Sequence, residues 1–427
     1  MFKTLKEAQT WIESITKFGE KYDLSRMRLA CAMLDHPEKK FQSIHIGGTN
    51  GKGSTVNFLK NILTDAGYRV GTYTSPYVVH FNERITLEEQ MIEDTLFLEH
   101  LNRIHVFEKN FMALHQDQLT FFELLTLVAF NVFAEAELDY AIIEVGLGGL
   151  LDATNVITPL ISAITSIGYD HMNVLGNTLS SILSNKLGIA KPNIPLVAGF
   201  EQKHLIKLTK HYCLDHAIPL DIVREQAQEI SHFDGDVQHF YFRGTPYRLN
   251  LWGLHQVQNA KVALMTTERL SQLGLSIPLE AKQSGIERTQ WPGRFERFGS
   301  IILEGAHNQN GMEAAVSTLQ HYFKDEPLTV VFTAMQDKDI TAMLRLIEPC
   351  ASQIIFTEIA YPRCEKAQNL KAMSPHPNAI AVKDRSTLLN IIKTAAETER
   401  VFITGSLYFI SDIRADIVKL FAPHSRT

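Results

Sequence analysis

Four short stretches of the chain carry residues that could bind phosphate and a metal ion. The segment GGTNGKGS, residues 47–54, combines glycines with Lys52, while Glu144 ends the apolar run YAIIE. Ser75 follows the run VGTYT, and His171 follows SAITSIGYD. Backbone N–H groups of a glycine-rich turn bind phosphate, and Mg²⁺ prefers the oxygens of one or two carboxylates together with phosphates and waters. These residues indicate a phosphate and magnesium site.

The glycine-rich segment departs from the strict phosphate-loop pattern, because Ile46 stands where the first Gly is expected and Gly53 where the Ser is expected. Its context nevertheless favours such a loop. A strand is predicted over residues 43–46, and three- and four-residue apolar spacing predicts a helix over 54–66. A strand, a turn and a helix N-terminus together form an anion site. The alternative is an ordinary turn that contains a lysine.

Short apolar runs alternate with helical patterns through the first two hundred residues. This alternation predicts an α/β fold with a parallel sheet covered on both faces, and the glycine-rich segment would make it a P-loop domain. Ligands of such sheets bind at the carboxyl ends of the strands. We therefore expect the four stretches to follow neighbouring strands and to lie on one edge of the sheet.

The second half of the chain predicts two further parts. Shorter alternating segments over residues 221–252 predict a small antiparallel β excursion, and new αβ units follow the segment QWPGRFERFG. We place a first domain, which contains the glycine-rich segment, at 1–297 and a second, Rossmann-like α/β domain at 298–427. In the latter, Glu304, His307 and Asn308 follow a predicted strand and face its ligand edge.

Composition excludes several classes of protein. The 427 residues are 45% hydrophobic and 21% charged, which is typical of a globular enzyme. A net charge of −6 gives no basic excess for nucleic acid, and no apolar run is long enough for a membrane span. The four cysteines are scattered without metal-ligand spacing, which favours a reduced, cytoplasmic protein.

Two of the candidate residues have a plain structural alternative. His171 could be an ordinary surface or packing histidine. Lys186 lies among apolar residues of a predicted helix, so it could extend its ammonium group to solvent. It could equally lie buried near the metal, where burial lowers its pKa.

The motifs taken in order resemble one family. GGTNGKGS, TYTSPYVVHFNERI, LTFFELLTLVAF, IIEVGLGGLLDATNV, SIGYDHMNVLGNT, WPGRFE, EGAHNQNG, DKD and TGSLY resemble the blocks of folylpolyglutamate synthase and dihydrofolate synthase. The resemblance implies an ATP- and Mg²⁺-dependent ligase that adds L-glutamate to a folate or to dihydropteroate. A carboxylate of the pterin substrate would be phosphorylated by ATP, and the amine of glutamate would attack the acyl phosphate.

The resemblance also implies roles for individual residues. The ATP phosphates would be held by Asn50, Gly51, Lys52, Gly53 and Ser54. The magnesium ligands would be Ser75, Glu144 and His171. The nucleotide site would be completed by Asn259, Arg294, Glu304 and His307. The pterin would be bound by Phe121, Phe122 and Asp152. Lys186 matches a lysine that is carbamylated in the family, and it joins Lys52, Glu144 and His171 in the catalytic set.

The chain departs from the family pattern near these residues. Glu304 stands where Asp is usual, and Leu150 where Arg is common. Asn185 and Leu187 flank Lys186 where the common block EKAGI has Glu and Ala. Two alternatives therefore stay open, a non-catalytic paralogue that binds nucleotide or folate, and a related ligase with another acceptor. The resemblance favours a monomer acting on small molecules, with no nucleic-acid or membrane partner.

Overall fold

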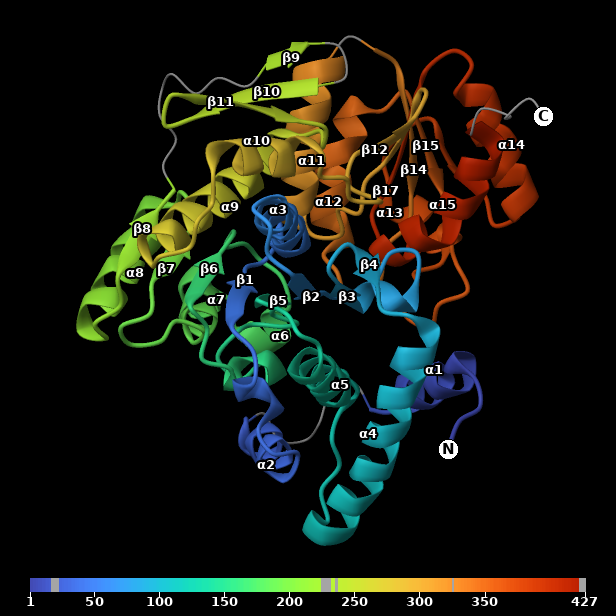
Figure 1. The fold of residues 1–427 in the computed structure, drawn as a ribbon. Coiled ribbons are helices and arrows are strands. Elements are labelled where there is room, and N and C mark those ends of the chain that lie inside the picture. The colour runs from blue at the N-terminus through green and yellow to red at the C-terminus, as the bar shows by residue number, and fades with distance from the viewer. Residues whose placement is uncertain (17–22, 224–231, 235–236, 325, 422–427) are drawn as a thin grey trace, which may run out of the picture. The chain divides into compact units, whose positions relative to one another are not determined.

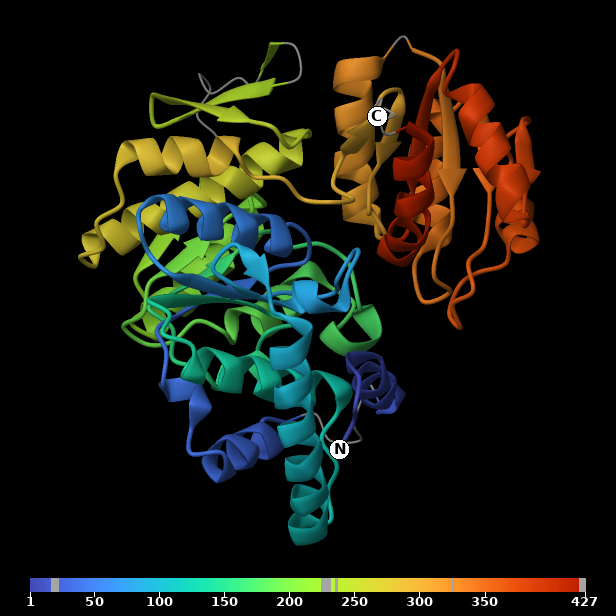
Figure 2. The same ribbon diagram turned by 45° about the vertical axis from the view of Figure 1, so that its right-hand side comes forward.

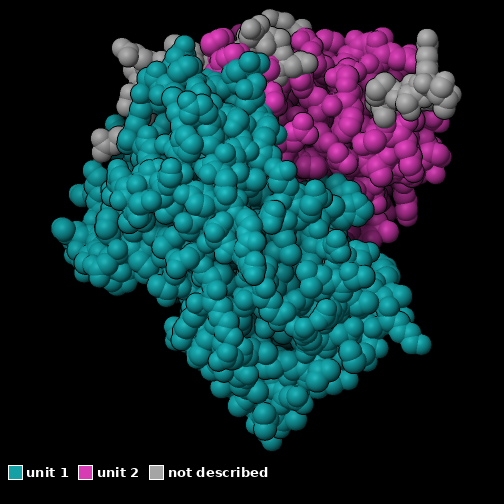
Figure 3. All heavy atoms as spheres, in the orientation of Figure 1, with its two compact units in different colours: residues 1–230, 240–248, 258–289 teal, residues 231–239, 249–257, 290–427 magenta. Residues whose placement is uncertain are grey.

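The computed structural model describes residues 1–16, 23–223, 232–234, 237–324 and 326–421. The chain divides into two compact units, coloured separately in Figure 3. Unit 1 contains residues 1–230, 240–248 and 258–289, and unit 2 contains residues 231–239, 249–257 and 290–427. Among the described residues, no helix combines the length and the apolar character that crossing a membrane requires.

Unit 1 is built on an eight-stranded sheet in the order β4-β3-β2-β5-β1-β6-β7-β8 (Figure 1). Its strands are β1 (Ser43–Gly47), β2 (Val70–Tyr73), β3 (Ile85–Leu87), β4 (Gln90–Met91), β5 (Tyr140–Glu144), β6 (Ile161–Ile164), β7 (Leu196–Ala198) and β8 (Leu220–Ile222). The strands from β2 to β8 in this order pair in parallel, and β3 and β4 add an antiparallel edge. The central strands read as continuous apolar runs because both faces of a parallel sheet are covered.

The described residues up to 289 also form helices. They are α1 (Leu5–Ser14), α2 (Ser25–Met33), η1 (Pro37–Lys39), α3 (Lys52–Asp65), η2 (Phe81–Arg84), α4 (Asp94–His115), α5 (Phe121–Glu135), η3 (Ala153–Val156), α6 (Met172–Leu175), α7 (Leu179–Leu187), α8 (Lys203–Asp215), α9 (Leu254–Gln272) and α10 (Leu279–Glu287). Ala141 and Ile143 of β5 share one core with α4 and α5. The start of α5 is fixed by a capping box, in which Thr120 and Glu123 each accept a hydrogen bond from the other's backbone N–H.

The antiparallel excursion is a three-stranded sheet of β9 (His232–Asp234), β10 (Val237–Phe242) and β11 (Thr245–Leu249), in which β9 and β10 pair antiparallel. The predicted excursion over residues 221–252 is confirmed for these strands, whereas residues 224–231 and 235–236 lie outside the described part of the chain. Its predicted start was wrong, because Asp221 belongs to β8 and pairs in parallel with Val197 of β7.

Unit 2 contains a six-stranded sheet in the order β12-β13-β17-β14-β15-β16. Its strands are β12 (Glu296–Phe298), β13 (Ile301–Leu303), β14 (Leu328–Phe332), β15 (Gln353–Phe356), β16 (Ala379–Ala381) and β17 (Arg400–Thr404). Its helices are α11 (Gln309–Phe323), α12 (Ile340–Ile347), η4 (Glu348–Cys350), α13 (Ala367–Met373), α14 (Arg385–Ala395) and α15 (Leu407–Phe421). Only β12 pairs antiparallel, and Figure 2 shows helices on both faces of the sheet. The predicted α/β class, with a P-loop domain and a second Rossmann-like domain, is confirmed.

Candidate active site

The glycine-rich segment forms a tight turn between β1 and α3. Gly51 caps the helix with a φ of 83°, a left-handed conformation that favours glycine. Thr55 donates its backbone N–H to the Gly51 carbonyl at 2.9 Å, so the helix begins at Lys52. The predicted start at Ser54 was therefore two residues late. Lys52, Gly53 and Ser54 form the first turn of α3, where backbone N–H groups lack intrahelical acceptors and can bind an anion.

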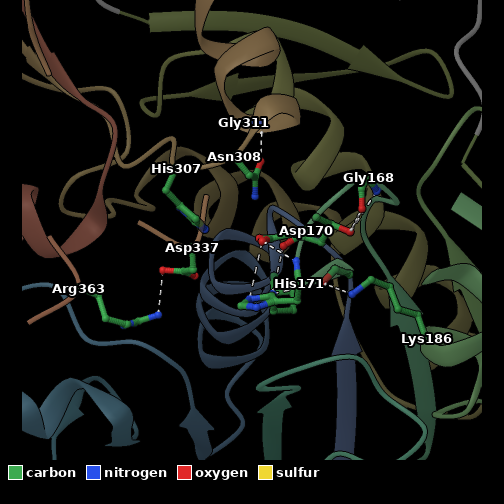
Figure 4. A network of polar contacts seen from close by, with 12 residues as sticks. Gly168, Asp170, His171, Lys186, His307, Asn308, Gly311, Asp337 and Arg363 are labelled. Carbon is green, nitrogen blue, oxygen red and sulfur yellow. Dashed lines mark hydrogen bonds and ion pairs between the residues drawn. The ribbon is translucent and has the colours of Figure 1, made fainter. Parts of the chain in front are cut away.

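Two lysines converge on the carbonyl of Gly48 at the start of this turn. Lys52 Nζ donates to it at 3.2 Å and Lys186 Nζ, from α7, donates at 2.9 Å (Figure 4). Lys186 is 3% exposed. Burial, with the charge of Lys52 acting in the same direction, lowers the pKa of Lys186 to about 7 against the opposing effect of Asp170 and Asp152. The Lys186 ammonium is therefore buried beside the phosphate loop and does not extend to solvent.

Residues after β6 support the loop from its other side. Thr165 and Ser166 donate their hydroxyls to the Asn50 carbonyl at 2.6 and 2.9 Å. Gly168 donates its N–H to Thr49 Oγ1 at 3.0 Å (Figure 4). The sequence interpretation did not include these hydroxyls. The signal was present, since Thr165 and Ser166 directly follow the apolar run that becomes β6.

The strand neighbours of β1 bring further candidates to the same edge of the sheet. β2, β5, β1 and β6 lie side by side, as predicted, so the residues that follow them share one edge. Glu144 is buried at the end of β5, and Ser75, after β2, donates its backbone N–H to Glu144 Oε2 at 3.2 Å. The structure thus joins two of the three predicted magnesium ligands.

The donor set of this edge fits a hard cation. Glu144 supplies carboxylate oxygens and Ser75 a hydroxyl, the ligand type that Mg²⁺ takes. Within the described ranges, no three His, Cys, Asp or Glu side chains group into a metal site by themselves. A magnesium ion here would therefore need phosphate oxygens and water as its remaining ligands, which is how this ion usually binds beside nucleotides.

His171 lies further along the chain, where it caps the short helix α6 with a φ of 49°. Its side chain is 38% exposed, and its Nε2 is 3.8 Å from Asp170 Oδ1. The backbone N–H of His171 donates to the same oxygen at 2.9 Å (Figure 4). The side chain is thus accessible on this edge, and its role as a metal ligand stays a prediction.

The predicted pterin residues meet around residues 146–147. The ring of Phe122 lies against Gly146, where an added Cβ would be 2.3 Å from the ring. Asp152 is buried and accepts the N–H of Leu147 at 2.7 Å, and burial raises the pKa of its carboxyl group. Phe122 also stacks on Tyr73 at 5.9 Å. The structure therefore brings Phe122 and Asp152 to one segment, with half-buried Phe121 beside Phe122 on α5.

Asn259 reaches the phosphate loop from α9. A Cβ added to Gly51 would lie 2.1 Å from Asn259 Oδ1, and Thr55 Oγ1 donates to the Asn259 carbonyl at 3.5 Å. A side chain at position 51 would clash with Asn259, which is a second reason for glycine there besides the left-handed φ. The predicted nucleotide residue Asn259 therefore contacts the loop directly.

In unit 2 the other predicted nucleotide residues form a second group. Glu304, directly after β13, accepts the N–H of Phe295 at 2.9 Å, and its Oε1 is 3.8 Å from Arg294 Nη1. Burial raises the pKa of Glu304 to about 7, which the charge of Arg294 opposes. His307 Nδ1 is 2.8 Å from the Gly305 carbonyl. Arg294, Glu304 and His307 thus lie together at the strand end of this sheet.

Comparison with known proteins agrees with this geometry. The Mur ligase middle domain matches residues 46–267, and the glutamate ligase domain of Mur ligases matches residues 293–407. The dihydrofolate synthase/folylpolyglutamate synthase of Bacillus subtilis is 38% identical over 97% of this chain and 99% of that protein.

Solved structures show the same likeness along the whole chain. E. coli FolC in complex with DHPP and ADP has a TM-score of 0.85 and 26% identity, covering 98% of both chains. A bifunctional folylpolyglutamate synthase/dihydrofolate synthase with Mn, AMPPNP and L-glutamate bound has a TM-score of 0.81 and 27% identity, covering 97% of this chain and 98% of that one. The chain therefore belongs to the folylpolyglutamate synthase/dihydrofolate synthase family of Mur-type, ATP-dependent amide ligases.

Proposed function

We propose that this protein uses ATP to ligate L-glutamate to a folate, to dihydropteroate or to both, through an acyl phosphate. One observation carries the proposal. The phosphate loop with Lys52 follows β1, and the buried carboxylate of Glu144 ends the adjacent parallel strand β5, in a chain that belongs to this family. Phosphoryl transfer needs a phosphate-binding loop beside a carboxylate that can hold a metal ion, because the reaction depends on positioning the phosphates and on neutralising their charge.

In this proposal the chain's own residues bind and orient the reactants. N–H groups of Gly51, Gly53 and Ser54 and the ammonium of Lys52 hold the ATP phosphates, and Asn50 and Asn259 shape the loop. Phe121 and Phe122 lie against the flat faces of the acceptor, and Asp152 accepts hydrogen bonds from its ring nitrogens. Arg294, Glu304 and His307 would also take part in nucleotide binding.

Magnesium would be held by Ser75, Glu144 and His171 together with phosphate oxygens. When bound, it would neutralise charge on the phosphate groups of ATP. A solved structure of a relative holds Mn with a nucleotide analogue, which supports a divalent cation as a cofactor.

Lys186 would act as a carbamate. A buried amine with a pKa near 7 is partly neutral at physiological pH, and a neutral amine attacks CO₂ to give a carbamate and a proton. The product is an anion, which would turn a repelling cation beside the magnesium site into a further oxygen ligand.

We also propose that residues 1–297 act as the ATP- and folate-binding domain and 298–427 as the ligase domain. The protein would work as a monomer in the cytoplasm, on small molecules alone. A single species at the mass of one chain in analytical ultracentrifugation would support the monomer, and a dimer would contradict it.

The test is ATP-dependent incorporation of labelled glutamate, with dihydropteroate and tetrahydrofolate offered separately. Incorporation with dihydropteroate identifies a dihydrofolate synthase, with tetrahydrofolate a chain extender, and with both a bifunctional enzyme. ATP binding without incorporation on either acceptor would reject the proposal in favour of a non-catalytic paralogue, and would direct attention to Leu150, Asn185 and Glu304.

A further inference from the structure

One buried histidine of unit 1 has no role in the site described so far. His45 lies in β1, two residues before Gly47, and is fully buried. β1 lies between β5 and β6, so the imidazole projects from the centre of the sheet and not from its edge. Its Nε2 is 2.9 Å from Thr154 Oγ1, while Nδ1 is buried without a hydrogen-bond partner among the residues that the structure describes. The polar edge of this ring is therefore aimed at Thr154.

Thr154 carries this contact on to Asp152. The Thr154 hydroxyl donates to Asp152 Oδ1 at 2.5 Å, and its backbone N–H donates to the same oxygen at 3.0 Å. A hydroxyl has one hydrogen and a carboxylate only accepts, so Thr154 Oγ1 must in turn accept a hydrogen bond from His45 Nε2. The chain of hydrogen bonds therefore runs from His45 through Thr154 to Asp152.

This direction requires a neutral imidazole with its proton on Nε2. A second proton, on Nδ1, would be a buried donor without an acceptor, which is costly. Burial also lowers the pKa of His45 to about 3, and the charge of Lys191 acts in the same direction. At physiological pH His45 is therefore a fixed hydrogen-bond donor that carries no charge.

The chain of hydrogen bonds ends on the carboxylate to which the proposed function assigns the ring nitrogens of the acceptor. Burial raises the pKa of Asp152, and hydrogen bonds from Thr154, Leu147 and Gly146 oppose that rise. Successive hydrogen bonds polarise one another, so the donor at His45 Nε2 strengthens the bond from the Thr154 hydroxyl. That bond keeps the carboxylate charged and in one orientation.

We propose that His45 is a positioning residue of the acceptor site, which acts through Thr154 on the carboxylate of Asp152. His45 belongs to the strand that leads into the phosphate loop, yet its Nε2 points to the residues of the acceptor site. Its loss should therefore weaken binding of the acceptor and leave binding of ATP unchanged. This inference rests on the proposed function and goes beyond it by adding a buried residue that sets the geometry of Asp152.

The test measures the dissociation constants of dihydropteroate and of ATP separately, by calorimetry on the full-length protein. Tetrahydrofolate takes the place of dihydropteroate if the wild type binds only tetrahydrofolate. Thr154→Val keeps the shape but removes the hydroxyl, so it should weaken acceptor binding about 10- to 100-fold, as for a hydrogen bond to a charged group. His45→Leu removes a bond between neutral groups and should weaken it about 3- to 10-fold.

Conservative variants separate positioning from packing. Thr154→Ser keeps the hydroxyl, and His45→Gln keeps an N–H donor near the place of Nε2, so both should bind the acceptor nearly as the wild type does. His45→Asn, whose shorter amide does not reach Thr154, takes the place of His45→Leu if His45→Leu does not fold. In an Asp152→Ala background His45→Leu should cause no further loss, because the carboxylate that it orients is gone.

His100→Leu is the matched control. His100 is 1% exposed, and its Nδ1 is also buried without a partner in the described part of the chain, but it lies on α4 beside Glu135. This variant should leave both dissociation constants unchanged.

Three results would overturn the inference. The first is wild-type acceptor binding in His45→Leu, and the second is an equal loss from His45→Leu in the Asp152→Ala background. The third is a loss of ATP binding as large as the loss of acceptor binding, which would show that the substitution distorts β1. A wild type that binds ATP but neither acceptor would instead contradict the proposed function itself.

Discussion

The buried amine of Lys186 gives the most quantitative prediction. Its pKa falls from 10.5 to about 7, and each pKa unit corresponds to about 1.4 kcal/mol, so the charged form destabilises the folded state by roughly 3 to 5 kcal/mol. Below about pH 7 the folded and unfolded chains both carry the proton, and this cost is fully present. Between about pH 7 and 10.5 only the unfolded chain is protonated, so the stability of the wild type rises with pH and the cost disappears.

Lys186→Met removes the charge but loses the hydrogen bond to Gly48, worth about 1 kcal/mol. The variant should therefore be more stable than wild type by roughly 2 to 4 kcal/mol near pH 6, and equal or slightly less stable near pH 10. Urea denaturation in CO₂-free buffer, followed by a probe in unit 1, measures the difference at both pH values. Lys203→Met, at an exposed site on α8, is the control and should change stability by no more than about 0.5 kcal/mol at either pH.

Two outcomes would refute this reasoning. A difference between wild type and Lys186→Met that is the same at both pH values would show that Lys186 does not titrate in the folded protein. A variant that is less stable than wild type near pH 6 would show that the ammonium is stabilised by groups other than those described.

Three further predictions concern the site. Lys52→Ala should lower turnover at least about 100-fold with little change in melting temperature, because a loop lysine adds little to the core; wild-type turnover would reject the phosphate-loop assignment. Glu144→Gln should raise the Mg²⁺ concentration needed for half-maximal rate by about tenfold or more, since a charged ligand is lost; an unchanged titration would remove Glu144 from the metal site. Burial raises the pKa of Glu304 to about 7, so its charged form destabilises unit 2. Glu304→Gln should therefore stabilise unit 2 by about 2 to 3 kcal/mol near pH 8 and by little near pH 4.5. Equal effects at both pH values in urea denaturation would contradict the raised pKa.

Local patterns in the sequence predict the parts of the site that depend on one segment. The run before GGTNGKGS and the helical spacing after it predicted β1 and α3, and the alternation of strands and helices predicted that four strand ends share an edge. The helix start was misplaced by two residues because apolar spacing does not register the cap, which in the structure is Gly51 in a left-handed conformation.

Features that need tertiary packing could not be read in this way. The burial of Lys186 depends on α7 packing against the turn after β1. The sequence shows only a cation among apolar residues, which also describes a surface side chain. The pKa of Glu304 likewise depends on burial beside Arg294, ten residues away.

The central claim is that ATP activates the carboxylate of the acceptor as an acyl phosphate. The most direct measurement uses an acceptor whose carboxylate is labelled with ¹⁸O, incubated with ATP, Mg²⁺, glutamate and the full-length protein. Attack of a carboxylate oxygen on the γ-phosphorus, followed by displacement by the amine, predicts that each phosphate released carries one ¹⁸O atom. Amide formation with unlabelled phosphate would contradict the account, because the acceptor would then be activated by another route.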